Sequence, residues 1–112
     1  MVPLDYQLIA VDLDDSLLGT DLEISAENKK ALLKAIDQGV LVTIATGRMF
    51  VSALPYAKQL GLDVPLITYQ GGLIKNALSN RIIYNRPLSL KSADKIIKMS
   101  LERKTHLQVY ID

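Results

Sequence analysis

The sequence predicts an α/β protein with a parallel sheet and flanking helices. Three short apolar runs, beginning at Leu8, Val40 and Val64, alternate with two segments of helical pattern. This order gives parallel strands joined by right-handed crossovers. Each run ends in a polar or glycine-containing turn, and the carboxyl ends of parallel strands border the ligand crevice of such sheets. We therefore look for a functional site on these three turns.

Composition excludes several classes of protein. The chain has 112 residues, which suggests one domain, and 49% of them are hydrophobic, which is too many for a disordered chain. The net charge of +1 and the scattered Lys and Arg give no electrostatic case for nucleic acid or an anionic membrane. The absence of cysteine excludes disulfides and thiolate chemistry, and no stretch approaches membrane-spanning length. We expect a cytoplasmic protein.

Two helices are expected between the apolar runs. Ser25 is a predicted N-cap with Glu27 in the first turn, and the helix ends at Gly39. Its apolar stripe consists of Ala31, Leu32, Ala35 and Ile36. The second helix covers much of Met49 to Leu60, where Pro55 would remove a hydrogen bond. A start near Ser52 would place Pro55 in the first turn, and a kink is the alternative.

The last third of the chain has a different pattern. Residues 73–75 and 81–84 predict a β-hairpin, and Pro87 marks a break. A last helix capped by Ser89 or Ser92 follows, and residues 107–111 predict the beginning of a strand.

Asp12 and Asp14 follow the first run, which we expect to form a strand buried on both faces. Residues two apart on a strand point to the same side, so both carboxylates could share one site. Two carboxylates at one site repel each other, and a hard cation such as Mg²⁺ relieves the repulsion. Leu17 and Leu18 are expected to turn the chain back onto the core. The alternatives are a metal-assisted catalytic site and an ordinary acidic strand exit.

The other two turns carry hydrogen-bond donors. Thr46-Gly47-Arg48 ends the second strand, where a hydroxyl and backbone amides could bind a phosphate oxygen, or small residues could simply form a turn. Gln70-Gly71-Gly72 ends the third strand and could line the crevice, but a tight turn is the favoured interpretation. His106, the only histidine, has no partner motif and is interpreted as an ordinary residue.

Together these strand ends resemble the haloacid dehalogenase superfamily. The segment Asp12-Leu-Asp14-Asp15-Ser16-Leu-Leu resembles its first motif, and Ile44-Ala-Thr46-Gly47-Arg48 resembles its second motif. The T-G-R form is typical of the Cof-type metabolite phosphatases, which carry an α/β cap. The resemblance implies a three-layer Rossmann-like core, present here as a partial parallel sheet. Residues 1–86 would form this core with the hairpin, and 87–112 the linker and the beginning of the cap.

The resemblance also implies roles for individual residues. Asp12 would be the nucleophile that becomes an aspartyl phosphate, and Asp14 the general acid and then the base. Mg²⁺ would be held by the Asp12 carboxylate and the Asp14 backbone carbonyl. Thr46 and Gly47 would bind the transferring phosphoryl group. The other candidates for phosphate or substrate binding are Arg48, Ser16 and Gly71.

The sequence departs from the family pattern at three positions. Asp15 replaces the more usual glycine, Ser16 replaces threonine, and Gln70 replaces asparagine. The family's lysine and its further acidic metal ligands have no counterpart in these 112 residues. We therefore expect the N-terminal part of a larger phosphatase, inactive by itself.

The leading hypothesis is Mg²⁺-dependent hydrolysis of a small phosphorylated metabolite. A phosphosugar mutase or a sugar-phosphate phosphatase of the same superfamily uses similar chemistry. The alternatives from other classes are an α/β module that binds an anion at the T-G-R turn and a non-catalytic fragment. Such a fragment would depend on a partner or self-associate through an exposed sheet edge. The sequence does not identify the substrate or the oligomeric state.

Overall fold

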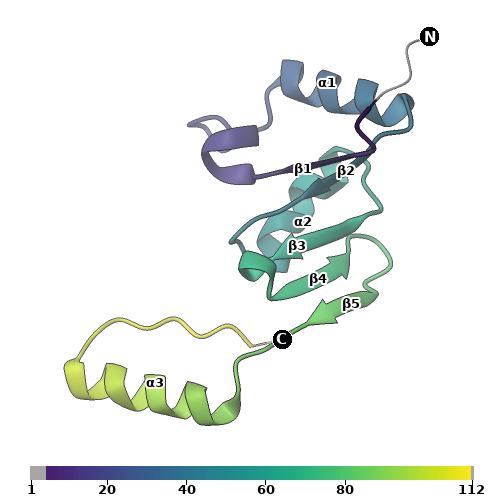
Figure 1. Ribbon diagram of the computed structural model, residues 1–112. Helices are drawn as coiled ribbons and strands as arrows, with labels where there is room; N and C mark the ends of the chain where they lie inside the picture. Colours follow the sequence, from purple (N-terminus) through teal and green to yellow (C-terminus); the bar gives the residue numbers. More distant parts are fainter. Residues whose placement is uncertain (1–4, 112) are drawn as a thin grey trace.

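A computed structural model describes residues 5–111 and confirms a mixed α/β architecture (Figure 1). Strand β1 (Leu8–Val11) pairs in parallel with β2 (Leu41–Ile44), with Leu8 opposite Leu41. Strand β3 (Pro65–Thr68) continues the parallel arrangement through a single bridge between Ala45 and Ile67. The three turns that follow β1, β2 and β3 therefore lie at one edge of the sheet, as the strand order predicted.

The predicted hairpin is present and extends the sheet. Strand β4 (Leu73–Asn76) pairs antiparallel with β3 on one side and with β5 (Ile82–Asn85) on the other. All four residues of β5 are exposed. Among the described residues, β1 pairs only with β2, and β5 only with β4. Both edges are open to further pairing, and self-association through them stays a prediction.

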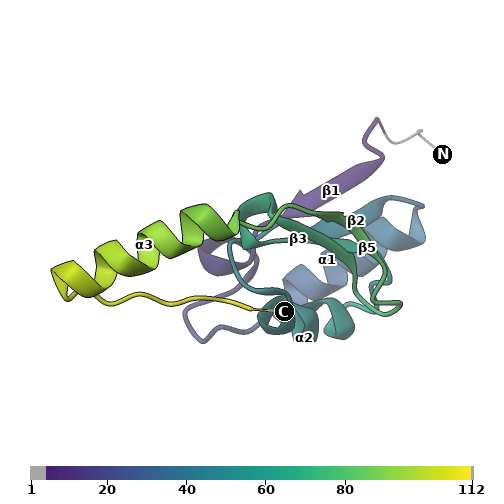
Figure 2. The same ribbon diagram turned by 90° about the horizontal axis from the view of Figure 1, so that it is seen from below.

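Two helices connect the parallel strands and lie on one side of them (Figure 2). Helix α1 (Ala26–Asp37) is capped by Ser25, whose hydroxyl accepts a hydrogen bond from Asn28 N–H, as predicted. Gly39 follows it with φ of 85°, a left-handed conformation that glycine adopts without a steric cost. Leu32 and Ile36, from the predicted stripe, pack against the core.

Helix α2 (Phe50–Gln59) begins earlier than the sequence predicted. The expected start near Ser52 is wrong, because Met49 is the N-cap and Pro55 lies inside the helix. Phe50 and Ala53 are buried against the sheet, and this burial favours helix in the first turn despite the proline. Pro55 itself is exposed, and so is Val51, whose carbonyl lacks the usual amide partner but lies where water can reach it.

The hydrophobic core lies between the sheet, α2 and the turn that follows β1. This turn, η1 (Leu13–Leu17), buries Leu13 and Leu17, and Leu18 comes directly after it. Leu17 N–H donates to the Asp12 carbonyl at 3.1 Å, which closes the turn. The leucines thus return the chain to the core as predicted, and they hold the acidic residues between them in place. Strand β1 itself alternates between exposed and half-buried residues, so the expectation of burial on both faces is wrong.

Helix α3 (Leu90–Arg103) projects from the sheet and its helices (Figures 1 and 2), and with α3 included the structure measures 61 × 31 × 24 Å. Ser89 caps it, and none of its residues is buried. The strand predicted over 107–111 is wrong: these residues pair with no described strand, and Tyr110 instead packs its ring against that of Tyr69. Within residues 5–111, no helix is long and apolar enough to cross a membrane.

Replacing Pro55 tests the account of α2. Pro55→Ala restores an amide that can donate to the Val51 carbonyl, and alanine has a much higher helix propensity. We expect the free energy of unfolding to rise by about 1–2 kcal/mol, after allowing for the greater freedom of the unfolded chain. Urea denaturation followed by circular dichroism measures the change, and Pro87→Ala, outside any helix, is the control. A loss of stability in Pro55→Ala would contradict the account.

Candidate functional site

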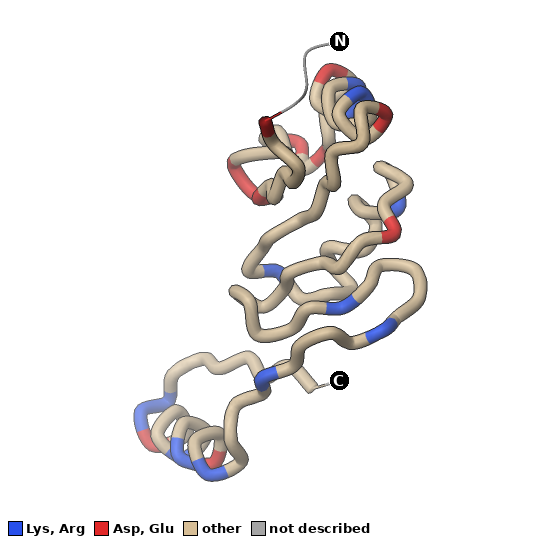
Figure 3. The backbone as a smooth tube through the Cα atoms, turned by 45° about the vertical axis from the view of Figure 1, so that its right-hand side comes forward, with Lys and Arg blue, Asp and Glu red and all other residues tan. Residues whose placement is uncertain are grey.

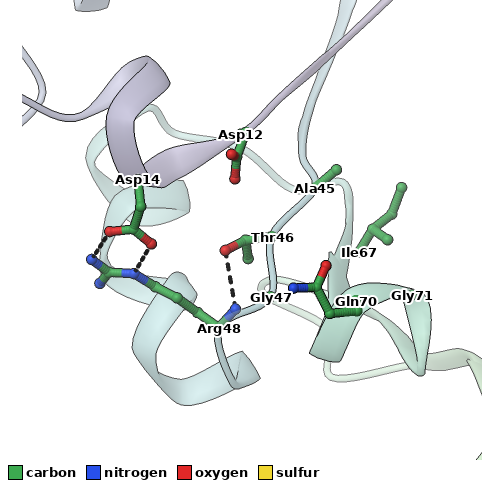
Figure 4. Close-up of a pocket in the computed structure, with 9 residues that line it drawn as sticks. All are labelled: Asp12, Asp14, Ala45, Thr46, Gly47, Arg48, Ile67, Gln70 and Gly71. Carbon is green, nitrogen blue, oxygen red and sulfur yellow. Dashed lines mark hydrogen bonds and ion pairs between the residues drawn. The ribbon is translucent and has the colours of Figure 1, made fainter.

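The turns that follow β1, β2 and β3 meet around one open pocket of about 660 Å³ (Figure 4). This volume is in the range of sites for small molecules. Polar groups from all three turns face it. Its lining residues are Asp12, Asp14, Ala45, Thr46, Gly47, Arg48, Ile67, Gln70 and Gly71.

Asp12 lies where β1 ends and η1 begins. Its Oδ1 accepts a hydrogen bond from Leu13 N–H at 2.8 Å, which fixes the carboxylate at the start of the turn. Its Oδ2 has no hydrogen-bond partner among residues 5–111. The adjacent turn is tightly bent, because Asp15 adopts φ of 59°. Glycine favours this left-handed conformation, and the family pattern has glycine at this position. One oxygen of Asp12 is therefore held rigidly, and the other is available to a ligand.

Thr46 and Gly47 supply hydrogen-bond donors at the end of β2. Thr46 is buried, and its Oγ1 accepts a hydrogen bond from Arg48 N–H at 3.1 Å. The hydroxyl hydrogen therefore remains free to donate, and no acceptor for it lies among the described residues. Gly47 N–H likewise has no acceptor within residues 5–111. The loop thus offers the pocket a hydroxyl and a backbone amide, which suits an anion.

Arg48 points at Asp14 instead of the middle of the pocket (Figure 4). Its Nε and Nη2 donate to the two oxygens of Asp14 at 2.8 and 2.6 Å, a bidentate ion pair. Its Nη1 donates to Ser52 at 3.4 Å, and the guanidinium lies 5.3 Å from the centre of the Tyr56 ring. These contacts hold the turn after β1 against α2.

The ion pair changes the acidity of both groups. The hydrogen bonds from Arg48, with the guanidinium charge, hold the pKa of Asp14 below its ordinary value of 3.8, although partial desolvation opposes this. The hydrogen bonds to Asp14 raise the pKa of Arg48. Asp14 is therefore an ionised carboxylate at neutral pH. Asp12 and Asp14 line the same pocket, although the chain leaves the extended conformation at Leu13.

The third turn, η2 (Tyr69–Gly71), is bound to the second by backbone hydrogen bonds. Tyr69 N–H donates to the Arg48 carbonyl at 3.0 Å, and Gln70 N–H to the Thr46 carbonyl at 3.2 Å. All three residues of η2 have positive φ, which is uncommon outside glycine. The Gln70 side chain lies across Gly47, where a Cβ would overlap its Nε2 and lie 3.0 Å from its Cδ.

The structure brings together most of the predicted site residues. Six of them line the pocket, namely Asp12, Asp14, Thr46, Gly47, Arg48 and Gly71. Ser16 does not line it and lies exposed in η1. Gln70 lines the pocket although a simple turn was the favoured interpretation. The one feature of the sequence that indicated Gln70 as a pocket residue was its position at the end of a third parallel strand.

The donors present are of the type that Mg²⁺ takes. The Asp12 carboxylate and the Asp14 backbone carbonyl are oxygen ligands, and Mg²⁺ is commonly bound by one or two carboxylates together with water and substrate phosphate. The Asp14 carboxylate is already engaged by Arg48. Within residues 5–111, no group of three or more His, Asp or Glu side chains could hold a metal ion. The described residues therefore fit part of a magnesium site.

Acidic and basic residues are distributed unevenly along the molecule (Figure 3). Asp and Glu cluster in the segment 12–25 after β1, which contains no Lys or Arg, whereas α1 carries both signs of charge. Lys and Arg are prominent on α3, away from the pocket. A phosphate that enters the pocket therefore meets carboxylates, and a cation bound there would reduce the repulsion.

Comparisons with known proteins identify the family of this chain. The sequence model of the haloacid dehalogenase-like hydrolases matches residues 9–112. The 5-amino-6-(5-phospho-D-ribitylamino)uracil phosphatase YwtE of Bacillus subtilis is 36% identical over 104 residues, which cover 93% of this chain and 35% of that protein. The pyridoxal phosphate phosphatase YbhA of Escherichia coli is 29% identical over 106 residues, covering 95% of this chain and 39% of the relative.

The fold is also similar to a solved structure. A haloacid dehalogenase-like hydrolase from Bacteroides thetaiotaomicron superposes with a TM-score of 0.80 at 27% identity. The match covers 89% of this chain and 39% of that structure. The chain thus spans well under half the length of the relatives it matches.

Removing Arg48 tests the ion pair at Asp14. In Arg48→Met we expect the Asp14 carboxyl pKa to rise toward 3.8, because the hydrogen bonds that favour its ionised form are gone. The ion pair stabilises the folded protein fully at pH values above the ordinary pKa of the Asp14 carboxyl. This stabilisation is lost as the pH falls through the lowered pKa that Asp14 has in the folded protein. A carboxyl-carbon NMR titration of Asp14 measures the shift. Lys98→Met, which breaks the exposed pair with Asp94, is the control, and an equal shift there would contradict the account.

Proposed function

The chain belongs to the haloacid dehalogenase-like hydrolase family, and we propose that it carries the nucleophile and phosphate-binding loop of a phosphate monoester hydrolase. The observation that supports this most directly is the shared pocket of Asp12, Thr46 and Gly47. Asp12 has a free carboxylate oxygen, while Thr46 and Gly47 have free donors for a phosphoryl group. A nucleophile beside an anion-binding loop is the arrangement that phosphoryl transfer requires.

The reaction that we propose has two steps. In the first, an Asp12 oxygen attacks phosphorus, the bond between phosphorus and the ester oxygen breaks, and Asp14 gives a proton to the leaving alcohol. In the second, Asp14 takes a proton from water as the water oxygen attacks phosphorus, and phosphate leaves Asp12. Covalent catalysis divides one difficult displacement into two easier ones. Thr46 and Gly47 would hold the phosphoryl oxygens through both steps.

The ion pair between Arg48 and Asp14 suits the two steps unequally. An ionised Asp14 is ready to accept a proton from water in the second step. Donation in the first step requires the protonated carboxyl, which the bidentate contact with Arg48 opposes. The first step therefore requires Arg48 and Asp14 to separate when substrate binds.

Mg²⁺ is part of the proposal, held by the Asp12 carboxylate and the Asp14 backbone carbonyl. When bound, it would neutralise charge on the phosphoryl group and reduce its repulsion from the carboxylates. The resemblance to the family supports it, as do the carboxylates of Asp12 and Asp14 in the pocket lining.

We propose a small phosphorylated metabolite as the substrate class. The pocket volume is suitable, and the two relatives named above act on different small phosphorylated compounds. The compounds in the names of these two relatives differ, and the feature that they share is the phosphate ester. We therefore propose a class of substrate and not a single compound.

We also propose that the 112 residues are inactive without further acidic ligands. The described residues lack a group of three metal-binding side chains, and the chain spans 35% of the length of YwtE. The division at residue 86, the cytoplasmic location and the absence of a nucleic-acid partner stay predictions. No observation favours the mutase or the anion-binding module over hydrolysis.

An assay of phosphate release tests this proposal in two proteins. One is the 112-residue chain, and the other is a chimera that continues after Asp112 with the corresponding remainder of YwtE. We expect Mg²⁺-dependent phosphate release from a panel of sugar and nucleotide monophosphates by the chimera, and none by the chain alone. In the chimera, Asp12→Asn should lower kcat at least about 1,000-fold, because the nucleophile is lost.

Asp21→Asn is the matched control for this assay. Asp21 is an exposed aspartate whose Oδ1 also accepts a backbone hydrogen bond, from Glu23, but it does not line the pocket. Its replacement should leave activity unchanged. Full activity of Asp12→Asn in the chimera would overturn the nucleophile, and turnover by the chain alone would overturn the need for further ligands.

A further inference from the structure

We propose that Gln70 is a phosphate-binding residue, whose side-chain amide donates a third hydrogen bond to the phosphoryl group beside Thr46 and Gly47. This rests on the proposed function of the pocket and adds a residue that lies outside the first and second motifs, at a position where the sequence departs from the family pattern.

The backbone of η2 holds Gln70 in a fixed, uncommon conformation. Its φ is 56°, and it lies between Tyr69 at 50° and Gly71 at 91°. The amides of Tyr69 and Gln70 donate to carbonyls of the phosphate-binding loop, so η2 moves with that loop. Left-handed backbone at a residue other than glycine or asparagine is unfavourable, and such strain tends to lie at functional sites.

The side chain of Gln70 extends over Gly47 toward the pocket (Figure 4). Its carboxamide occupies the space that a Cβ at position 47 would need. It makes no hydrogen bond with any of the described residues, and Gln70 is exposed. The amide therefore lies beside Gly47, and both of its hydrogens are without an acceptor among residues 5–111.

A simple turn does not explain this arrangement. Turn formation at positive φ favours glycine or asparagine, and glutamine has no such advantage. A phosphoryl group, however, presents three oxygens, while Thr46 and Gly47 provide one clear donor each. An amide donor carries no charge, so it can approach the phosphate without pairing with Asp12 or Asp14. Gln70 thus offers the pocket a neutral side-chain donor in addition to Thr46 and Gly47.

Binding of inorganic phosphate to the 112-residue chain, in the presence of Mg²⁺, tests the proposal. Gln70→Gly removes the amide and also relieves the left-handed strain, so we expect the Tm to stay equal or rise. The dissociation constant for phosphate, measured by NMR titration, should increase about threefold to twentyfold, as for a lost hydrogen bond to a charged group at an exposed site. A residue that only shaped the turn would leave the constant unchanged.

Asn80→Gly is the matched control, because Asn80 has φ of 57° in a loop away from the pocket. It relieves the same kind of strain and should not change phosphate binding. Gln70→Asn tolerates the left-handed backbone but shortens the side chain, so it should weaken binding too. If the Gln70→Gly protein does not fold, Gln70→Asn is the variant that decides.

Thr46→Val separates this proposal from the function on which it rests. Loss of binding in Thr46→Val with unchanged binding in Gln70→Gly would overturn the role of Gln70 and leave the pocket as a phosphate site. No binding by the unaltered chain would overturn both. Equal weakening in Asn80→Gly and Gln70→Gly would overturn the role of Gln70 as well, because the effect would then come from loop backbone and not from the amide.

Discussion

The hydrogen bonds made by the Thr46–Arg48 loop hold the site together. Through its side chain, Arg48 fixes Asp14 from the turn after β1. Through their carbonyls, Thr46 and Arg48 fix η2 from the turn after β3. The parallel strands bring the three turns to one edge of the sheet, but strands alone would leave them as separate loops. The middle loop joins them into one pocket and sets the direction of each polar group that faces it.

This arrangement leaves specific groups free. The oxygen Oδ2 of Asp12, the hydroxyl hydrogen of Thr46 and the amide of Gly47 have no partners among residues 5–111. Their immediate neighbours are engaged, which keeps the free groups in position without satisfying them. Unsatisfied, fixed groups of opposite character at one pocket are suited to a ligand that has both an electrophilic centre and negatively charged oxygens. A phosphate ester has both.

The sequence was sufficient for the parts of the structure that depend on local pattern. Alternating strands and helices predicted the sheet edge where Asp12 and Thr46 meet, and Ser25 and Gly39 predicted the ends of α1. The helix start at Phe50 was not predictable from propensity, because burial of its side chain outweighs the cost of Pro55. The strand expected near Leu107 failed for a related reason, since strand formation requires a neighbour that the described chain does not provide.

In the site, too, local sequence pattern predicted some features and tertiary contacts decided the others. Residue types at the strand ends indicated which side chains could meet, but not which of them would pair with each other. Arg48 was a candidate for the phosphate, and the structure places it in the pocket lining with its guanidinium paired to Asp14 of η1. Gln70 was passed over because a Gln-Gly-Gly turn has no distinctive pattern, and its place over Gly47 depends on hydrogen bonds between distant loops.

Mapping phosphate binding by backbone amide shifts tests the central claim most directly. In a ¹H–¹⁵N NMR titration of the chain with inorganic phosphate and Mg²⁺, the account predicts the largest shift at the free amide of Gly47. Smaller shifts should follow in η1 and η2, the two turns joined to that loop. Shifts centred on the basic residues of α3, with Gly47 unmoved, would contradict the claim that these three turns form one phosphate site.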